Sequence, residues 1–539
     1  MRDLRLWSSL LLAPLLLKST LGYPSQTPLH SSSHPVLATS NYTGYELRRY
    51  GISNRQDLSH MIQTLNNDNI DIWQLTPTHV DVHMDTIHLS KALSNRTYVT
   101  LPYSFPYTHS YQQPLTKTPI PLPDVSSLQN STFHGAYHTL EEIDSFVTAL
   151  ANTYPKLVEV VWLGGSWENR DVFAIRIGKR GGGGKHKHKK GKKGKKGVIK
   201  AECATGRSRG GRRRGRSEWS VRRDWESMKA TYRMIVRCFA WLRARLLGSK
   251  EADAPPSIRA MYIDESAIHA QHHRVKERIV IQGAQHAREW IATSTALYLA
   301  HALVAPKNES GSLRHLLDET DFTVIPVPNP DGYAYTWTTD RLWYKNRMDV
   351  LPGAHTPKSD ACKGIDMNRN WGYEWNSSSM NASVGLDDPC SHWYPGAYPF
   401  QAPEVTAIAN YIRRTPKIRA FIDLRSYGQK LMYPYSFSCD QVPPHAEDII
   451  EAALGATKAL REKHGAAYTS GASCELLYPA PGNIIDWMYG DAKVKYSYSL
   501  MLRDTGTYGF MLPPRWIQPV GEETAAAIES LVKFIKDVI

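Results

Sequence analysis

The fold class of this protein is indicated by one stretch of its sequence, Arg278-Ile279-Val280-Ile281-Gln282-Gly283-Ala284-Gln285-His286-Ala287-Arg288-Glu289-Trp290-Ile291. A short apolar run leads through a polar turn into an apolar helix pattern that continues to Leu303. A buried strand followed by a turn and a helix is typical of α/β proteins. His286 and Glu289, three residues apart on the turn, are of the types that bind Zn²⁺, although a hydrolytic zinc needs three protein ligands and an open position for water.

Strand-like and helix-like segments alternate outward from this stretch. The expected strands cover 157–162, 171–177, 279–282, 322–327 and 420–424. The expected helices cover 140–154, 290–303, 403–412, 446–460 and 524–539. Thr139 is expected to cap the first helix, with Glu142 completing a capping box. The alternation predicts an α/β sandwich in which helices cover a mixed, mostly parallel sheet.

The N-terminal part of the chain has the pattern of a secreted precursor. Residues 1–22 combine two early arginines with a short apolar run, which is typical of a signal peptide and too short to span a bilayer. Residues 23–125 predict a propeptide region, with a small α+β domain and a Pro-rich linker. The main domain is expected over 133–539. These features predict a secreted or vacuolar protein.

Secretion gives meaning to two kinds of residue. Six Asn-X-Ser/Thr sequences become candidate glycosylation sites: Asn41, Asn95, Asn130, Asn308, Asn376 and Asn381. The 6 cysteines become disulfide candidates. Two of them, Cys203 and Cys238, lie in a basic segment.

That basic low-complexity segment interrupts the main domain as an insertion at 179–275. The excess of Lys and Arg over Asp and Glu within 179–250 is larger than the net charge of +14 of the whole chain, so the remainder of the chain is mildly acidic. Gly-rich basic tracts cannot bury a core, which predicts disorder. Helical apolar spacing at 225–247 permits binding to a membrane surface or an acidic partner, and the charge permits binding to a nucleic acid or another polyanion. The alternative is an inert loop or translated intron sequence over 199–278, because so long an intrusion between two strands is unusual.

Four collinear motifs resemble those of the A/B-type zinc metallocarboxypeptidases. They are Gln285-His286-Ala287-Arg288-Glu289-Trp290-Ile291, Asn329-Pro330-Asp331-Gly332-Tyr333, Gly364-Ile365-Asp366-Met367-Asn368-Arg369-Asn370-Trp371 and Leu502-Arg503-Asp504-Thr505-Gly506-Thr507-Tyr508-Gly509-Phe510. The resemblance covers 133–539 apart from the insertion. It implies a carboxypeptidase-like sheet between helices, preceded by a small α+β pro-domain. It also implies zinc ligation by His286 and Glu289, with Asp366 orienting the histidine.

The resemblance implies that the residues of a substrate-binding set are retained. They are Arg288, Asn368, Arg369, Ser426, Tyr427, Tyr478 and Ile485. Asn368 and Arg369 match the pair that grips the C-terminal carboxylate of a substrate, a task that suits the planar fork of arginine. Tyr478 matches the tyrosine that covers the substrate, and Ile485 matches the floor of an apolar side-chain pocket. Cys362 with Cys390 matches the family disulfide, and a second bridge is expected between Cys439 and Cys474.

Three positions that carry the chemistry of the family hold other residues here. The third zinc ligand is replaced by Arg425, which has no lone pair for a metal. Tyr344 stands in place of the arginine that stabilises the oxyanion, and Met501 stands in place of the general base. Losing a general base costs about 10²–10⁴ in rate, and losing an oxyanion donor about 10²–10³. Asp423, on the same expected strand as Arg425, is expected to face away and to supply no substitute base.

We therefore expect Arg425 to form an ion pair with Glu289 in place of the zinc that the family implies. Within the family, the pattern is most similar to the fungal inactive metallocarboxypeptidase-like proteins linked to cell-wall organisation. This resemblance implies a catalytically inactive protein that binds peptide C-termini or a cell-wall-related partner. The rival interpretations are an active zinc carboxypeptidase that releases C-terminal apolar residues and a polyanion or nucleic-acid binder that acts through 179–250.

Overall fold

The structure is a computed structural model, and it describes residues 42, 44–68, 70–86, 93, 95–102, 122–179, 276–350, 362–375 and 388–538. Several expectations lie outside the described residues: the signal peptide at 1–22, the insertion from 180 to 275 with Cys203 and Cys238, and the sequons at Asn41, Asn376 and Asn381. The sequon residues Asn95, Asn130 and Asn308 are described and are exposed.

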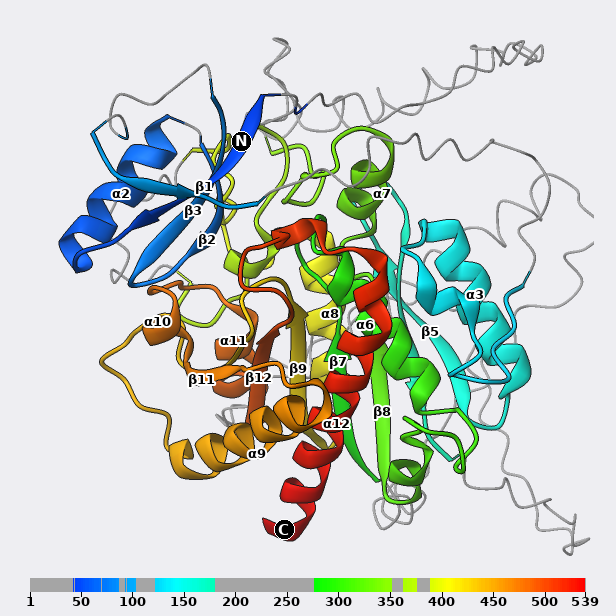
Figure 1. Cartoon of the computed structure of the whole chain (residues 1–539). Helices are drawn as coiled ribbons and strands as arrows, with labels where there is room; N and C mark the ends of the chain where they lie inside the picture. Colours follow the sequence, from blue (N-terminus) through cyan, green and yellow to red (C-terminus); the bar gives the residue numbers. More distant parts are fainter. Residues whose placement is uncertain are drawn as a thin grey trace, which may run out of the picture. The chain divides into compact units, whose positions relative to one another are not determined.

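A mixed sheet of eight strands forms the centre of the main domain (Figure 1), in the order β11-β10-β12-β9-β7-β8-β6-β5. The strands are β5 (Val158–Gly165), β6 (Asp171–Ile177), β7 (Glu277–Gln282), β8 (Thr320–Ile325), β9 (Ile418–Arg425), β10 (Lys430–Tyr433), β11 (Thr469–Ala472) and β12 (Tyr496–Met501). The pairs β10–β11, β12–β9, β9–β7 and β7–β8 are parallel. The pairs β10–β12, β8–β6 and β6–β5 are antiparallel. The expected fold class, a mixed and mostly parallel sheet, is confirmed.

Helices cover both faces of this sheet. They are α3 (Leu140–Thr153), α6 (Trp290–Ala302), α7 (Pro330–Thr338), α8 (Pro403–Arg414), α9 (Ala446–His464), α10 (Ser473–Leu476), α11 (Ile484–Gly490) and α12 (Ile517–Val538). Ile279 and Ile281 of β7 share a core cluster with α3, α6, α9 and α12, whereas Val280 between them packs with α8 and α11. Successive residues of a strand point to opposite faces, so one strand serves both layers. Within the described ranges, no helix is both long enough and apolar enough to cross a membrane.

Two helix termini show how the local sequence acts. The capping box expected at Thr139 and Glu142 is present at the start of α3. Helix α12 begins at Ile517 rather than at the expected Thr524. Pro519 lies in its first turn, where the missing N–H leaves no intrahelical hydrogen bond unmade. The helix can therefore begin before Pro519, because a proline is tolerated in the first turn.

A small α+β unit precedes the main domain. It contains β1 (Tyr45–Gly51), α2 (Arg55–Asn67), β2 (Asp71–Leu75), β3 (His79–Asp85) and β4 (Tyr98–Thr100). Its sheet has the order β2-β3-β1-β4, and all neighbouring strands are antiparallel. Side chains of α2 pack on the sheet, and Trp393 of the main domain joins this core cluster. We call this part the N-terminal unit.

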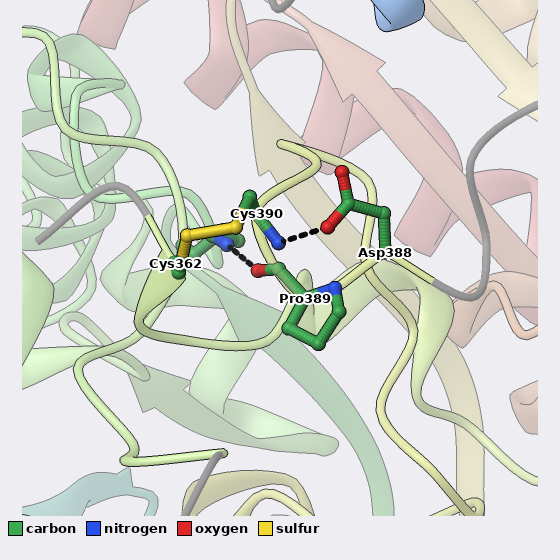
Figure 2. The surroundings of a disulfide bond; sticks show 5 residues. Cys362, Asp388, Pro389 and Cys390 are labelled. Carbon is green, nitrogen blue, oxygen red and sulfur yellow. Dashed lines mark hydrogen bonds between the residues drawn. A yellow bond between two sulfur atoms is a disulfide. The ribbon is translucent and has the colours of Figure 1, made fainter. Parts of the chain in front are cut away.

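The two expected disulfides have different outcomes. The bond between Cys362 and Cys390 is formed (Figure 2). The second bridge is absent, because Cys439 and Cys474 are free thiols. Burial and a hydrogen bond with Cys439 raise the pKa of the Cys474 thiol. A raised pKa suppresses the thiolate, which is the form that attacks to make a disulfide.

Candidate functional site

The residues expected to carry chemistry meet at the carboxyl ends of β7, β9 and β12. Arg425 ends β9 and Met501 ends β12, and the two are paired in register. His286 and Glu289 lie in the turn between β7 and α6. Parallel strands place their carboxyl ends at one edge of a sheet, which is where open α/β sheets bind ligands. A small cavity of about 80 Å³, partly open to solvent, lies at this edge.

The cavity brings together most of the candidate residues. Those that line it are His286, Glu289, Tyr344, Asn368, Arg369, Arg425, Ser426, Tyr478 and Met501. Three others do not line it, namely Arg288, Tyr427 and Ile485. The positions matched to zinc chemistry and those matched to carboxylate binding therefore share one space.

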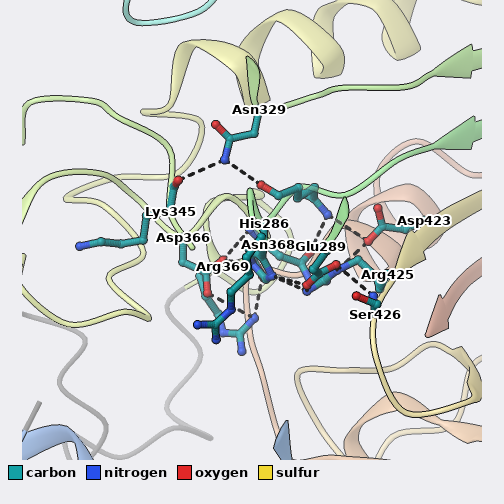
Figure 3. Close-up of polar contacts among 12 residues, drawn as sticks. His286, Glu289, Asn329, Lys345, Asp366, Asn368, Arg369, Asp423, Arg425 and Ser426 are labelled. Atoms are coloured by element: carbon teal, nitrogen blue, oxygen red, sulfur yellow. Dashed lines mark hydrogen bonds and ion pairs between the residues drawn. The ribbon is translucent and has the colours of Figure 1, made fainter. Parts of the chain in front are cut away.

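Arg425 lies beside Glu289, Asp423 and Ser426 (Figure 3). Its Nε donates to Glu289 Oε2 at 2.9 Å, and its Nη2 donates to Glu289 Oε1 at 3.0 Å. Nη2 also contacts His286 Nδ1. The side chains of Arg425 and Glu289 are 7% and 2% exposed, so the pair is shielded from solvent. The ion pair expected from the sequence is confirmed, and it has the bidentate form that planar groups favour.

His286 is held between two partners. Because a guanidinium can only donate, Nδ1 of His286 accepts from Arg425 and its Nε2–H donates to Asp366 Oδ1 at 2.7 Å. Burial acts to raise the pKa of Asp366, but His286 and Arg369 outweigh it and lower that pKa to about 2. Burial likewise opposes ionisation of Glu289, yet the charge of Arg425 lowers its pKa to about 2. Both carboxylates are therefore ionised near neutral pH.

The described residues do not fit a zinc ion. The Nδ1 lone pair of His286 and both oxygens of Glu289 already accept hydrogen bonds from Arg425. The backbone N–H of Ser426 adds a further bond to Glu289 at 3.1 Å. A guanidinium offers a metal no lone pair and repels a cation. No set of three or more metal-binding side chains occurs within the described ranges.

Asp423 lies beside Arg425, so the expectation that it faces away is wrong. Residues two apart on a strand point to the same face, and Asp423 Oδ2 is 3.7 Å from Arg425 Nη1. Gln282 and Gln285 donate to its oxygens at 3.1 and 3.0 Å. Burial raises the pKa of Asp423 to about 7. Asp423 is not among the residues that line the cavity, so it does not reach a ligand bound there.

Tyr344 and Met501 occupy the other two replaced positions. The Tyr344 ring stacks on His286 with a centroid distance of 3.6 Å, and burial raises its pKa well above the usual value. Tyr344 is therefore uncharged and cannot supply the positive charge of an arginine. The thioether of Met501 has no basic site for a proton. Met501 therefore supplies no general base, and Tyr344 lacks the positive charge with which an arginine stabilises an oxyanion.

Asn368 and Arg369 lie on the short 3₁₀ turn Met367–Arg369 at another wall of the cavity. Arg369 Nη2 donates to the Tyr478 hydroxyl, and its Nη1 donates to the Asn368 carbonyl at 2.9 Å. The nearest carboxylate oxygen to Nη1, Asp366 Oδ2, is 4.0 Å away. Asn368 Oδ1 accepts from Ile484 N at 3.0 Å, which fixes the orientation of its amide. Both residues thus present donors without a bonded carboxylate.

Arg288 is buried beneath the N-terminal unit rather than in the cavity. Its Nη1 donates to both oxygens of Asp71 at 2.8 Å, and its Nη2 donates to the Ile72 carbonyl at 3.2 Å. The guanidinium also lies 4.3 Å from the centroid of the Phe510 ring, in cation–π geometry. Asp71 and the Ile72 carbonyl of β2 therefore already accept from Nη1 and Nη2 of Arg288.

Tyr427 and Ile485 are also placed differently from the substrate-binding role that the resemblance implies. The Tyr427 hydroxyl donates to Asp81 Oδ2 of β3 at 2.9 Å, so it ties the main domain to the N-terminal unit. Ile485 is fully buried in the core beside Trp487 and Met488. Ile485 does not line the cavity.

Sequence reasoning missed one wall of the cavity. Residues 72–75 of β2 line it, together with Trp393, Phe510 and several polar side chains. Those polar side chains are Ser436, Ser473, Asn483 and Ser499. No motif marks β2, and it lies more than 200 residues before the zinc-type motif in the sequence. The contact that ties this wall to the site joins Asp71 to the buried Arg288, and it is visible only in the tertiary structure.

The sheet, the site at its carboxyl edge, and the arrangement of Asn368 and Arg369 in the cavity define a carboxypeptidase-like protein. The family model described as zinc carboxypeptidase matches residues 251–527, and the chain belongs to this family.

Named relatives agree with this placement. The inactive metallocarboxypeptidase ECM14 of Blastomyces gilchristii is 28% identical over 550 residues, covering 95% of this chain and 75% of that protein. A structure of bovine thrombin-activatable fibrinolysis inhibitor in complex with tick carboxypeptidase inhibitor is 26% identical, covers 76% of this chain and 100% of that chain, and has a TM-score of 0.52. Carboxypeptidase A from Helicoverpa armigera has a TM-score of 0.60 at 20% identity over 92% of this chain and 98% of that chain, which shows the fold alone.

Replacing Arg425 is expected to change metal content. The protein as it stands should hold far less than one zinc per chain by elemental analysis after dialysis against zinc. Arg425→His removes the guanidinium and gives His286 and Glu289 a third ligand of the right type, so that variant should approach one zinc per chain. Arg425→Met, which supplies no nitrogen ligand, is the control. Stoichiometric zinc in the unsubstituted chain would contradict the ion-pair interpretation.

Proposed function

We propose that this protein is a catalytically inactive, carboxypeptidase-like binding protein whose cavity holds the C-terminus of a peptide. The absence of activity is supported by the three replaced positions, Arg425, Tyr344 and Met501. Metal ligation, oxyanion stabilisation and proton transfer each lack a required group. The names of the ECM14 relatives, which are called inactive metallocarboxypeptidases, support the same proposal.

The observation that carries the binding proposal is the state of Arg369. Its guanidinium lines the cavity and donates to a neutral hydroxyl, not to a carboxylate. Its Nε has no hydrogen-bond partner within the described ranges. A buried cation with unused donors favours an anion that can pair with it in a bidentate manner. The amide of Asn368 on the same turn adds a neutral donor, so the pair suits a terminal carboxylate.

The site of action is proposed on sequence grounds alone. The signal-like segment at 1–22 and the sequons support action outside the cytosol, in a secreted or vacuolar compartment. A role in cell-wall organisation rests wholly on the resemblance to the fungal inactive proteins. The ligand would then be a protein C-terminus met in that compartment.

Calorimetric titration with a blocked dipeptide ending in phenylalanine tests the proposal. The full chain should bind the dipeptide and release no phenylalanine, with or without added zinc. Arg369→Gln should weaken binding about 10–100-fold, because hydrogen bonds to charged groups contribute about 1.5–3 kcal/mol.

Arg413→Gln is the matched control, since Arg413 is an exposed arginine on α8 that does not line the cavity. That variant should bind like the unsubstituted chain. Release of phenylalanine that a chelator abolishes would establish an active enzyme instead. Equal affinity of the Arg369→Gln and Arg413→Gln variants would remove the carboxylate site from the proposal.

A further inference from the structure

The ion pair with Glu289 uses only part of the Arg425 guanidinium. Nε and Nη2 donate to Glu289, and Nη2 also contacts His286. Nη1 is 3.7 Å from its nearest carboxylate oxygen, on Asp423, which is beyond hydrogen-bond reach. Within the described ranges Nη1 makes no hydrogen bond. It also does not belong to the completely buried nitrogen atoms that lack a hydrogen-bond partner. Nη1 is therefore not completely enclosed, and its N–H groups are not used in a hydrogen bond within the described ranges.

This nitrogen belongs to a side chain that lines the same cavity as Arg369. The two arginines differ in how their charge is balanced. Glu289 makes two hydrogen bonds to Arg425, whereas no carboxylate is hydrogen-bonded to Arg369 within the described ranges. Arg369 therefore favours an anion, and Arg425 favours a neutral acceptor such as a carbonyl oxygen.

We infer that Arg425 Nη1 donates a hydrogen bond to the peptide carbonyl of a ligand whose terminal carboxylate binds Arg369. This inference rests on the proposed function and deepens it, because it makes Arg425 a ligand-binding residue. The residue that displaces the metal also takes over contact with the ligand, by hydrogen bonding and without activating water. Ligand binding is consequently independent of metal and insensitive to chelators.

The first test uses the full chain without substitution and a matched pair of ligands. Both are pseudodipeptides with a C-terminal phenylalanine analogue. One has a ketomethylene link that keeps the carbonyl oxygen, and the other has a CH₂–CH₂ link that lacks it. The ketomethylene ligand should bind about tenfold more tightly, because it alone accepts the charge-assisted hydrogen bond. Addition of a chelator should leave both affinities unchanged. Equal affinities for the two ligands would overturn the inference.

The second test uses Arg425→Lys, which keeps the charge and loses the planar fork. Thermal unfolding confirms that the variant is folded. The variant should bind the ketomethylene ligand about tenfold more weakly. Its affinity for 3-phenylpropionate, which carries only the carboxylate and the ring, should stay within about twofold of the unsubstituted chain. An equal loss for both ligands would mean that Arg425 acts only through the shape of the site, and the inference would fail.

The outcomes separate this inference from the proposed function. If 3-phenylpropionate binds and Arg369→Gln abolishes that binding, the carboxylate site stands whatever the carbonyl comparison gives. If neither 3-phenylpropionate nor the ketomethylene ligand binds the unsubstituted chain, the proposed function fails and this inference fails with it. If 3-phenylpropionate and the ketomethylene ligand both bind, but the two pseudodipeptides bind with equal affinity, only this inference is rejected.

Discussion

Arg425→Ala is expected to lower the free energy of unfolding by about 3–5 kcal/mol, the usual loss when one member of a buried ion pair is removed. The substitution removes the charge that keeps Glu289 ionised, in a site where the Glu289 side chain is 2% exposed, so Glu289 must stay buried as an unpaired carboxylate or take up a proton. It also leaves the Nδ1 of His286 without its donor. Urea denaturation at pH 7, followed by tryptophan fluorescence and by far-UV circular dichroism, measures the change.

Arg419→Ala is the matched control on the same strand. Arg419 pairs with Glu277 at the opposite end of β9, and the two side chains are 47% and 33% exposed. Such solvent-exposed pairs contribute about 0–1 kcal/mol. Both variants remove one arginine from an ion pair. The difference between their losses of unfolding free energy therefore measures the effect of burial. Similar losses for Arg425→Ala and Arg419→Ala would mean that the central ion pair does not stabilise the site.

The double variant Arg425→Met with Glu289→Leu sharpens this point. Replacing both charges by apolar side chains removes the uncompensated carboxylate, so much of the loss should be recovered. If the double variant is as stable as the unsubstituted chain but no longer binds the ketomethylene ligand, the pair serves recognition and not folding. Selection for binding would then account for keeping two buried charges where apolar packing suffices.

The sequence predicted the scaffold well because its signals are local. The apolar run of β7 and the capping box at Thr139 depend on neighbouring residues, and both are present. The ion pair of Arg425 with Glu289 was predictable because the motifs set the positions and opposite charges supply the reason. The position of Asp423 was misjudged by a simple periodicity error, since residues two apart on a strand share a face.

Tertiary contacts account for what the sequence did not reveal. Arg288 and Tyr427 donate hydrogen bonds to Asp71 and Asp81, which come from strands of the N-terminal unit. Neither Arg288 nor Tyr427 lines the cavity. Ile485 is buried in a core cluster to which β7, α8, β9 and α11 all contribute. Asp71 and Arg288, like Asp81 and Tyr427, are separated by more than 200 positions. No local sequence pattern around one partner predicts its contact with the other.

The site also makes a prediction about acid. The folded-state pKa of Glu289 is about 2, against 4.5 for the free side chain. A carboxyl group whose folded pKa lies below its unfolded value stabilises the protein above the unfolded pKa, and this stabilisation is lost as pH falls through the folded pKa. Glu289 thus contributes fully above about pH 4.5 and nothing below about pH 2. A shift of this size corresponds to about 3 kcal/mol.

Glu289→Gln makes that contribution measurable. Glutamine resembles the protonated form of Glu289, so the variant should be about 3 kcal/mol less stable than the unsubstituted chain at pH 7. The gap in unfolding free energy should narrow as pH falls from about 4.5 and close near pH 2, because Glu289 itself is then protonated. Urea denaturation of both proteins at intervals from pH 7 to pH 2 gives the gap directly.

Glu277→Gln provides the control for this profile, since Glu277 belongs to the exposed pair with Arg419. Its gap to the unsubstituted chain should stay small at every pH. A gap for Glu289→Gln that is independent of pH would mean that shape and hydrogen bonding, not the ionised carboxylate, hold Arg425 in place. A gap that closes only at acid pH would instead identify the Glu289 charge as the partner of Arg425, and would explain how this site stays ordered with a guanidinium in the position of a metal ligand.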